Sequence, residues 1–224
     1  MSVAVRAAAT VAPGSIGIMG GTFDPIHLGH LAAAEEAREV LGLERILFVP
    51  AGIPPHKPDE PISVAADRVA MVGLAIAGNP AFELSRIDVD RAGPSYTVDT
   101  VEALAAIERT AGRTPNLTFI LSVETLLELP TWHEPERLFA ACRLAVVPRE
   151  GYPAPQRGWL AEQFPGREDR VVSLDGPRLG VSSTAIRARV VAGRSIRYLV
   201  PAAVADYIAA HHLYAAAPGR TPSS

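Results

Sequence analysis

The chain has 224 residues, of which 48% are hydrophobic and 20% charged, a balance typical of a globular protein and not of a disordered one. The formal net charge of −3 argues against a nucleic-acid partner, because general nucleic-acid coat proteins are usually strongly basic. The single cysteine, Cys142, excludes an intramolecular disulfide and a zinc site built from several cysteines.

The two ends of the chain differ from its middle. Residues 1–15 are rich in alanine and lack a run of large apolar residues, so we expect a disordered extension there. Residues 215–224 are expected to form a frayed tail. Since no stretch approaches the roughly 18 apolar residues of a membrane-spanning helix, we expect no membrane contact and a cytoplasmic protein. The sequence leaves a homo-oligomer open.

Strand and helix signals alternate between these ends. In chain order we expect a strand at 15–19, a helix at 30–41, strand 45–49, helix 63–77, strand 82–89, helix 96–110, strand 117–121, helices 123–129 and 135–141, strand 143–147, helix 155–164, strand 170–174, and helices 183–191 and 201–211. Gly42 is the expected end of the first helix, and Ser63 the expected cap of the second. A proline-rich loop, 50–61, precedes that cap.

This alternation predicts an α/β fold with an open parallel sheet and helices on both faces. Sheets of this class bind ligands beyond the carboxyl ends of their strands. No internal repeat or linker is visible, so we expect a single domain over 16–214, with the last two helices as a small C-terminal subregion.

The strongest motif is the run Gly20-Gly21-Thr22-Phe23-Asp24-Pro25-Ile26-His27-Leu28-Gly29-His30. Its glycines follow a strand, where the backbone must approach something closely or take positive φ. His27 and His30 share a face at the start of a helix, where free N–H groups favour anions. An isolated pair of this spacing is more often a tight turn with two capping histidines, but here eleven consecutive residues agree.

A second motif is Val181-Ser182-Ser183-Thr184-Ala185-Ile186-Arg187. Hydroxyl groups at a helix start can cap the helix and also meet an anion. Arg187 lies one turn after Ser183 and can bind phosphate oxygens with its planar fork. Taken alone, a segment of this kind is more often an ordinary helix cap followed by a surface arginine.

A third group consists of Pro54-Pro55-His56-Lys57, Ser95-Tyr96-Thr97-Val98-Asp99-Thr100 and Trp132. Lys57 is the single lysine among 21 basic residues, a hint of a role that arginine does not fill. Each part also has a simpler interpretation: a linker with a solvated charge, an acidic first turn of a helix, and a core tryptophan.

Together the three motifs resemble those of the HxGH nucleotidyltransferases, a superfamily with a Rossmann-like fold, and among them the bacterial nicotinate-nucleotide adenylyltransferases. The resemblance covers about 16–214. It implies adenylyl transfer from ATP to nicotinate mononucleotide, giving deamido-NAD and pyrophosphate in NAD biosynthesis, with Mg²⁺ bound to ATP. The motifs of P-loop kinases and dinucleotide-dependent dehydrogenases, GxxxxGK[ST] and GxGxxG, are missing.

The resemblance also implies roles for individual residues. The catalytic set is His27, His30 and Arg187. The expected ATP-binding residues are Gly20, Gly21, Thr22, Phe23, His27, His30, Glu124, Ser183, Thr184 and Arg187. The expected mononucleotide-binding residues are Asp24, Lys57, Thr97, Asp99, Trp132 and His133.

The chain departs from the family pattern at two places. Ser122-Val123-Glu124 stands where the family usually has Gly-x-Asp, and His133 stands where an aromatic residue is common. Three alternatives therefore stay open: a phosphopantetheine adenylyltransferase, an adenylyltransferase that prefers the amidated mononucleotide, and a non-catalytic nucleotide-binding protein.

Overall fold

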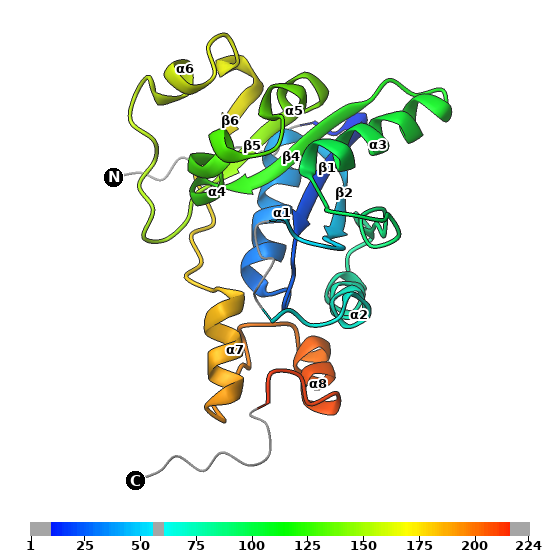
Figure 1. The fold of residues 1–224 in the computed structure, drawn as a ribbon, viewed down its shortest axis with the longest axis vertical. Helices are drawn as coiled ribbons and strands as arrows, with labels where there is room; N and C mark the ends of the chain where they lie inside the picture. The colour runs from blue at the N-terminus through cyan, green and yellow to red at the C-terminus, as the bar shows by residue number, and fades with distance from the viewer. Residues whose placement is uncertain (1–9, 56–60, 216–224) are drawn as a thin grey trace.

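The computed structural model describes residues 10–55 and 61–215. Six parallel strands form one sheet in the order β3-β2-β1-β4-β5-β6 (Figure 1). The strands are β1 Ala12–Gly21, β2 Leu43–Pro50, β3 Phe82–Leu84, β4 Asn116–Ser122, β5 Arg143–Val147 and β6 Val171–Ser173. This order reverses between β1 and β4, as in doubly wound α/β folds.

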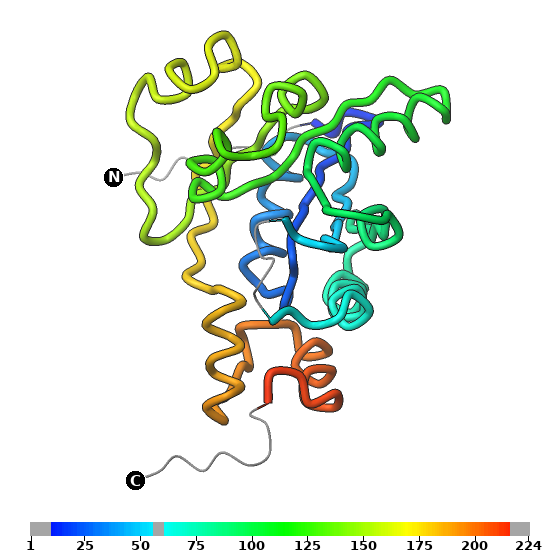
Figure 2. Tube along the Cα trace, viewed as in Figure 1, coloured from blue at the N-terminus to red at the C-terminus, as the bar shows by residue number. Residues whose placement is uncertain are grey.

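Helices connect the strands and cover both faces of the sheet. They are α1 Leu28–Leu41, α2 Ala65–Ile76, α3 Thr97–Thr110, α4 Val123–Glu128, α5 Pro135–Ala141, α6 Trp159–Gln163, α7 Ser183–Val191 and α8 Ala202–Ala210, with 3₁₀ turns at Leu129–Thr131 and Glu168–Arg170. The last two helices lie together at one end of the molecule, as the tube in Figure 2 shows. None of the helices in the described part of the chain is long and apolar enough to cross a bilayer.

Two apolar clusters hold these layers together, one on each face of the sheet. Along β1, Ile16 and Ile18 belong to the cluster under α3, α4 and α5, while Met19 belongs to the cluster under α1, α2, α7 and α8. Alternation of this kind follows from the two-residue period of a strand. Gly17 lies between the isoleucines because a Cβ there would come within 2.4 Å of the Ile46 side chain.

The structure confirms the expected fold class and corrects several element bounds. The strand expected at 82–89 ends at Leu84, because the chain turns at once and the Asp90 N–H bonds to the Arg86 carbonyl, 2.9 Å away. The helix expected at 155–164 shrinks to Trp159–Gln163, preceded by Gly158 at φ +91°. Ser63 does not cap α2, whose N-cap is Val64.

The two expected chain ends are described only in part. Residues 1–9 of the expected extension and 216–224 of the expected tail lie outside the described residues. The strand β1 begins at Ala12, four residues before the start we expected for the domain.

Candidate active site

A cavity of about 390 Å³ opens at the carboxyl ends of β1 and β4, where the strand order reverses. It is the position at which folds of this class bind their ligands. Residues from widely separated parts of the chain line it: Met19, Gly20, Gly21, Thr22, His27, Gly29, His30, Ala33, Ala51, Pro54, Pro55, Asp88, Ser95, Thr97, Thr100, Phe119, Ile120, Leu121, Ser122, Glu124, Thr125, Glu128, Trp132, Val147, Pro148, Arg149, Pro177, Leu179 and Val181.

The two histidines of the first motif meet in this cavity. His27 is the N-cap of α1, and its backbone N–H donates to Nδ1 of His30, 3.3 Å away. The two rings stack with their centroids 3.7 Å apart. Because Nδ1 of His30 accepts this hydrogen bond, a neutral His30 carries its proton on Nε2, where it can donate to an anion.

Burial and a nearby cation keep both imidazoles neutral at pH 7. Burial, aided by the charge of Arg149, lowers the pKa of His27 to about 4. Burial also lowers the pKa of His30 well below its usual value, with smaller contributions from His27 and Arg149. The buried Nδ1 of His27 has no hydrogen-bond partner among the described residues.

These pKa values predict a stability that falls in mild acid. Between pH 6.5 and about 4 the unfolded chain binds a proton at His27 that the folded chain does not. The free energy of unfolding should therefore drop as the pH falls, by about 2 kcal/mol from pH 7 to pH 5 for His27 alone. Urea denaturation at the two pH values tests this. The loss should be smaller in His27→Asn, and an equal loss in both proteins would contradict the assignment.

Gly29 is required by the ring of His27. A Cβ at position 29 would lie 3.0 Å from Nδ1 and 3.1 Å from Cε1 of that ring. We expect Gly29→Ala to displace the His27 ring by a few tenths of an ångström and to lower kcat about tenfold, since catalysis by positioned groups is sensitive to small displacements. Gly73→Ala is the matched control, because that helical position has room, with its nearest neighbour 3.9 Å away. Equal kcat in both variants would show that the ring position is unimportant.

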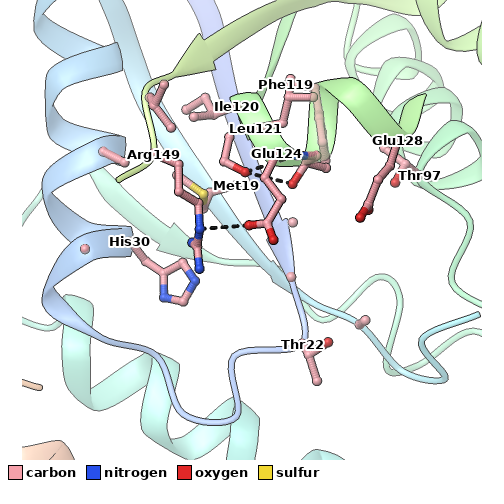
Figure 3. A pocket seen from close by; sticks show the side chains of 18 of the residues that line it. Met19, Thr22, His30, Thr97, Phe119, Ile120, Leu121, Glu124, Glu128 and Arg149 are labelled. Atoms are coloured by element: carbon pink, nitrogen blue, oxygen red, sulfur yellow. Dashed lines mark hydrogen bonds and ion pairs between the residues drawn. The ribbon is translucent and has the colours of Figure 1, made fainter. Parts of the chain in front are cut away.

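Arg149, which no motif in the sequence indicated, projects into the cavity beside His30 (Figure 3). Its Nε lies 2.8 Å from Oε2 of Glu124, and the Tyr152 hydroxyl also bonds to that carboxylate. Arg149 follows β5 by two residues, so its place just after a strand is the signal that could have revealed it. The cavity thus holds a cation, paired with Glu124, next to the two histidines.

The second motif reaches the cavity through Val181, whereas its expected phosphate-binding residues Ser183, Thr184 and Arg187 lie against the turn before His27 and do not line the cavity. Ser183 Oγ donates to the carbonyl of Pro25 over 2.8 Å, and Arg187 Nη1 donates to the carbonyl of Asp24 over 2.7 Å. Thr184 lies within 3.5 Å of Nη2 of Arg187. The N-terminus of α7 is therefore adjacent to the turn that leads to His27.

Phe23 and Asp24 are buried and do not line the cavity. Phe23 packs its ring edge-on against His30, with 5.1 Å between centroids. The Asp24 carboxylate accepts hydrogen bonds from the backbone N–H of Ser63 and from the hydroxyl of Tyr214. Both residues shape the turn around the histidines.

The other end of the cavity contains Thr97 and Trp132 from the third group. Trp132 stands edge-on to Phe119, with 6.2 Å between ring centroids. His133 and Asp99 do not line the cavity. The ring of His133 packs on the ring of Tyr96, with 4.3 Å between their centroids. Lys57 lies outside the described residues.

Asp88, Ser95 and Thr100 also line the cavity, although none of them was among the expected site residues. The Asp88 carboxylate accepts from the Thr100 hydroxyl over 2.6 Å and pairs with Arg91. Ser95 Oγ accepts the N–H groups of Gly52 and Ile53. These contacts tie the loop after β2 to the start of α3.

The described residues contain no group of three or more histidine, cysteine, aspartate or glutamate side chains that could hold a metal ion. The cavity instead offers neutral imidazoles, Arg149 and helix N-termini to one ligand region, and an aromatic side chain with backbone donors to the other. This combination suits two anionic ligands of which one carries a flat ring.

Comparison with known proteins agrees with this geometry. A family model described as "Cytidylyltransferase-like" matches residues 18–189. A relative from Roseiflexus sp. (strain RS-1) is 48% identical over 201 residues, which cover 89% of this chain and 97% of the relative. A relative from Dehalococcoides mccartyi is 45% identical over 200 residues, 88% of this chain and 96% of the relative. Both bear the name "Probable nicotinate-nucleotide adenylyltransferase".

Solved structures show the same fold. The nicotinic acid mononucleotide adenylyltransferase of Plasmodium falciparum in complex with NaAD superposes with a TM-score of 0.74 at 18% identity, covering 89% of this chain and 97% of that one. Its complex with APC superposes with a TM-score of 0.71 at 18% identity, covering 90% and 97%.

Proposed function

Since this chain belongs to the cytidylyltransferase-like family, and within it to the nicotinate-nucleotide adenylyltransferases, we propose that it transfers the adenylyl group of ATP to nicotinate mononucleotide. The products are deamido-NAD and pyrophosphate, in NAD biosynthesis. The observation that carries the proposal is the shared cavity. It has the histidine pair at one end and Thr97 and Trp132 at the other, so two nucleotides can meet in it.

In this reaction an oxygen of the mononucleotide 5′-phosphate attacks the α-phosphorus of ATP. The new P–O bond forms as the bond to the β-phosphate oxygen breaks, and pyrophosphate leaves with the electron pair. No protein nucleophile is needed, and Cys142 is unsuited to that role because burial raises the pKa of its thiol to about 12. Catalysis then depends on positioning and on stabilising phosphate charge.

The histidines supply part of that stabilisation. A neutral His30 donates from Nε2 to a phosphate oxygen while its Nδ1 is held by the backbone N–H of His27. Arg187, adjacent to the turn through Asp24, serves the leaving pyrophosphate together with Ser183 and Thr184.

Arg149 adds a cation to the same region. Its charge is balanced by Glu124. We place Glu124 at the adenosine end, and binding of a triphosphate would draw Arg149 away from the carboxylate, which is then free to accept ribose hydroxyl groups. Gly20, Gly21 and Thr22 allow the triphosphate to approach the backbone closely.

Mg²⁺ enters this proposal as part of the ATP substrate. Phosphate oxygens and water suffice to hold an ion of this kind. The ion supplies charge neutralisation of the triphosphate. The cytoplasm as compartment and a homo-oligomeric assembly stay predictions.

A pyrophosphate-release assay tests the proposal with three acceptors: nicotinate mononucleotide, nicotinamide mononucleotide and phosphopantetheine. We expect deamido-NAD, identified by mass, from the first. Release with phosphopantetheine alone would reassign the acceptor. ATP binding in calorimetry without release for any acceptor would favour the non-catalytic alternative.

A further inference from the structure

Arg68 is the largest of the fully buried side chains, and it belongs to α2, outside the cavity. It is 2% exposed. Burial lowers the pKa of its guanidinium, yet an arginine stays protonated at neutral pH. A buried charge of this kind needs several well-placed acceptors to compensate for its lost hydration.

Those acceptors are four backbone carbonyls from three separate segments. Nη1 donates to the carbonyls of Thr22 over 2.9 Å and Ala51 over 2.6 Å. Nη2 donates to the carbonyl of Gly52 over 3.1 Å, and Nε to that of Ser63 over 3.0 Å. One planar group therefore joins the loop after β1, the loop after β2 and the chain that enters α2.

Two of these segments carry opposite ends of the cavity. Thr22 lies in the turn that leads to His27, and it lines the cavity itself. Ala51 also lines the cavity, and the N–H of the next residue, Gly52, bonds to Ser95 Oγ, two residues before Thr97. A backbone hydrogen bond from Ala51 N–H to the Gly21 carbonyl, 2.9 Å long, is the direct link between the two loops.

We propose that Arg68 is a positioning residue. It sets the separation between the turn that leads to His27, where the phosphates of ATP bind, and the loop after β2, which leads to the end of the cavity with Thr97 and Trp132. It does so by holding the Thr22, Ala51 and Gly52 carbonyls on one rigid fork. This inference rests on the proposed adenylyl transfer, and adds to it a residue that touches neither substrate.

The reaction makes this separation important. In-line attack needs the acceptor oxygen to lie close to the α-phosphorus and opposite the leaving group, and a misplacement near 1 Å can lower the rate a hundredfold. A lysine keeps the charge but has one nitrogen and a different donor geometry, so it cannot hold four carbonyls from three directions. Arg68→Lys therefore separates geometry from charge, whereas Arg68→Met removes both.

Arg170 provides a matched control. Its Nε and Nη2 donate to the carbonyls of Phe139 and Cys142 over 3.2 Å and 3.1 Å, and it does not line the cavity. Arg170→Lys and Arg170→Met thus also remove arginine–carbonyl bonds, at a place where the proposal assigns no role in positioning.

The experiment measures kcat, both KM values and Tm for wild type and the four variants, well below the lowest Tm. Hydrogen exchange is followed in peptides covering 20–24 and 50–54. We expect Arg68→Lys to lower kcat about tenfold or more and to raise exchange in both peptides, while Arg170→Lys keeps kcat within about twofold. If Arg68→Met fails to fold, the lysine variant decides.

Unchanged kcat in a folded Arg68→Lys protein would overturn the inference, as would a fall in kcat with unchanged exchange in both peptides. The inference would also be overturned if the Arg68 and Arg170 variants lost the same fraction of kcat for the same fall in Tm, because general destabilisation would then explain the loss. A wild-type protein that transfers no adenylyl group would refute the proposed function instead, and the exchange measurement would still test whether Arg68 holds the two loops.

Discussion

Replacing His30 by alanine is expected to lower kcat by roughly 100- to 1000-fold, the usual cost of removing one well-placed donor to developing charge. The Nε2 donor of His30 is fixed by two contacts, the hydrogen bond from the His27 backbone and the stacked His27 ring. Because its bond to phosphate strengthens as charge builds up, the loss should fall mainly on kcat and much less on KM. Steady-state kinetics with saturating nicotinate mononucleotide measure both.

His211→Ala is the control for this prediction. His211 stacks on Tyr207 after α8, 4.0 Å between ring centroids, and does not line the cavity. Its loss should leave kcat within about twofold of wild type, in line with a peripheral substitution. If His30→Ala instead raises KM alone, His30 contributes to ground-state binding, and near-wild-type kinetics would remove it from the site.

A second large effect is expected in the choice between the acid and the amide mononucleotide. We expect kcat/KM to favour nicotinate mononucleotide by roughly a hundredfold, because each buried donor left unpaired by the neutral amide costs about 1–3 kcal/mol. The helix α3 begins at Thr97, which lines the cavity, and the first N–H groups of a helix have no partner within it. We expect these donors and the backbone near His133 to hold the carboxylate.

Trp132→Ala distinguishes stacking from charge recognition. The Trp132 side chain lines the same end of the cavity and should stack on the pyridine ring of either substrate. Its removal should weaken both mononucleotides, while the ratio of their kcat/KM values changes less than the values themselves. Comparable kcat/KM for the two substrates in the wild type would refute the acid preference and leave the adenylyl-transfer chemistry standing.

Short-range signals were sufficient for much of the fold. The bounds of β5 and α5 and the C-terminal end of α3 agree with their expected residues, because apolar periodicity and nearby caps act within a few residues. The strand predicted to extend beyond Leu84 is absent there, and the cause is again a local interaction. Its alternating Ile87 and Val89 suit a strand, but the Arg86–Asp90 turn competes for the same backbone.

The site was predictable where consecutive residues carry the chemistry. The motif around His27 and His30 placed both in the cavity, and the third group placed Thr97 and Trp132 at its other end. The roles of these residues stay predictions until the variants are measured. Asp24 shows the limit, because its carboxylate is engaged by Ser63 and Tyr214, partners far away in the sequence.

The fold class, the family resemblance and the pair of histidines are thus encoded in neighbouring residues. The pairing of Arg149 with Glu124 and the link that Arg68 makes between Thr22 and Ala51 arise only when the chain is folded. Arg68 is separated in the sequence from Thr22 by 46 residues and from Ala51 by 17. These segments come together because β1 and β2 are neighbours in the sheet. No local pattern encodes these contacts, because an arginine that binds distant carbonyls has the same sequence neighbours as one that faces solvent.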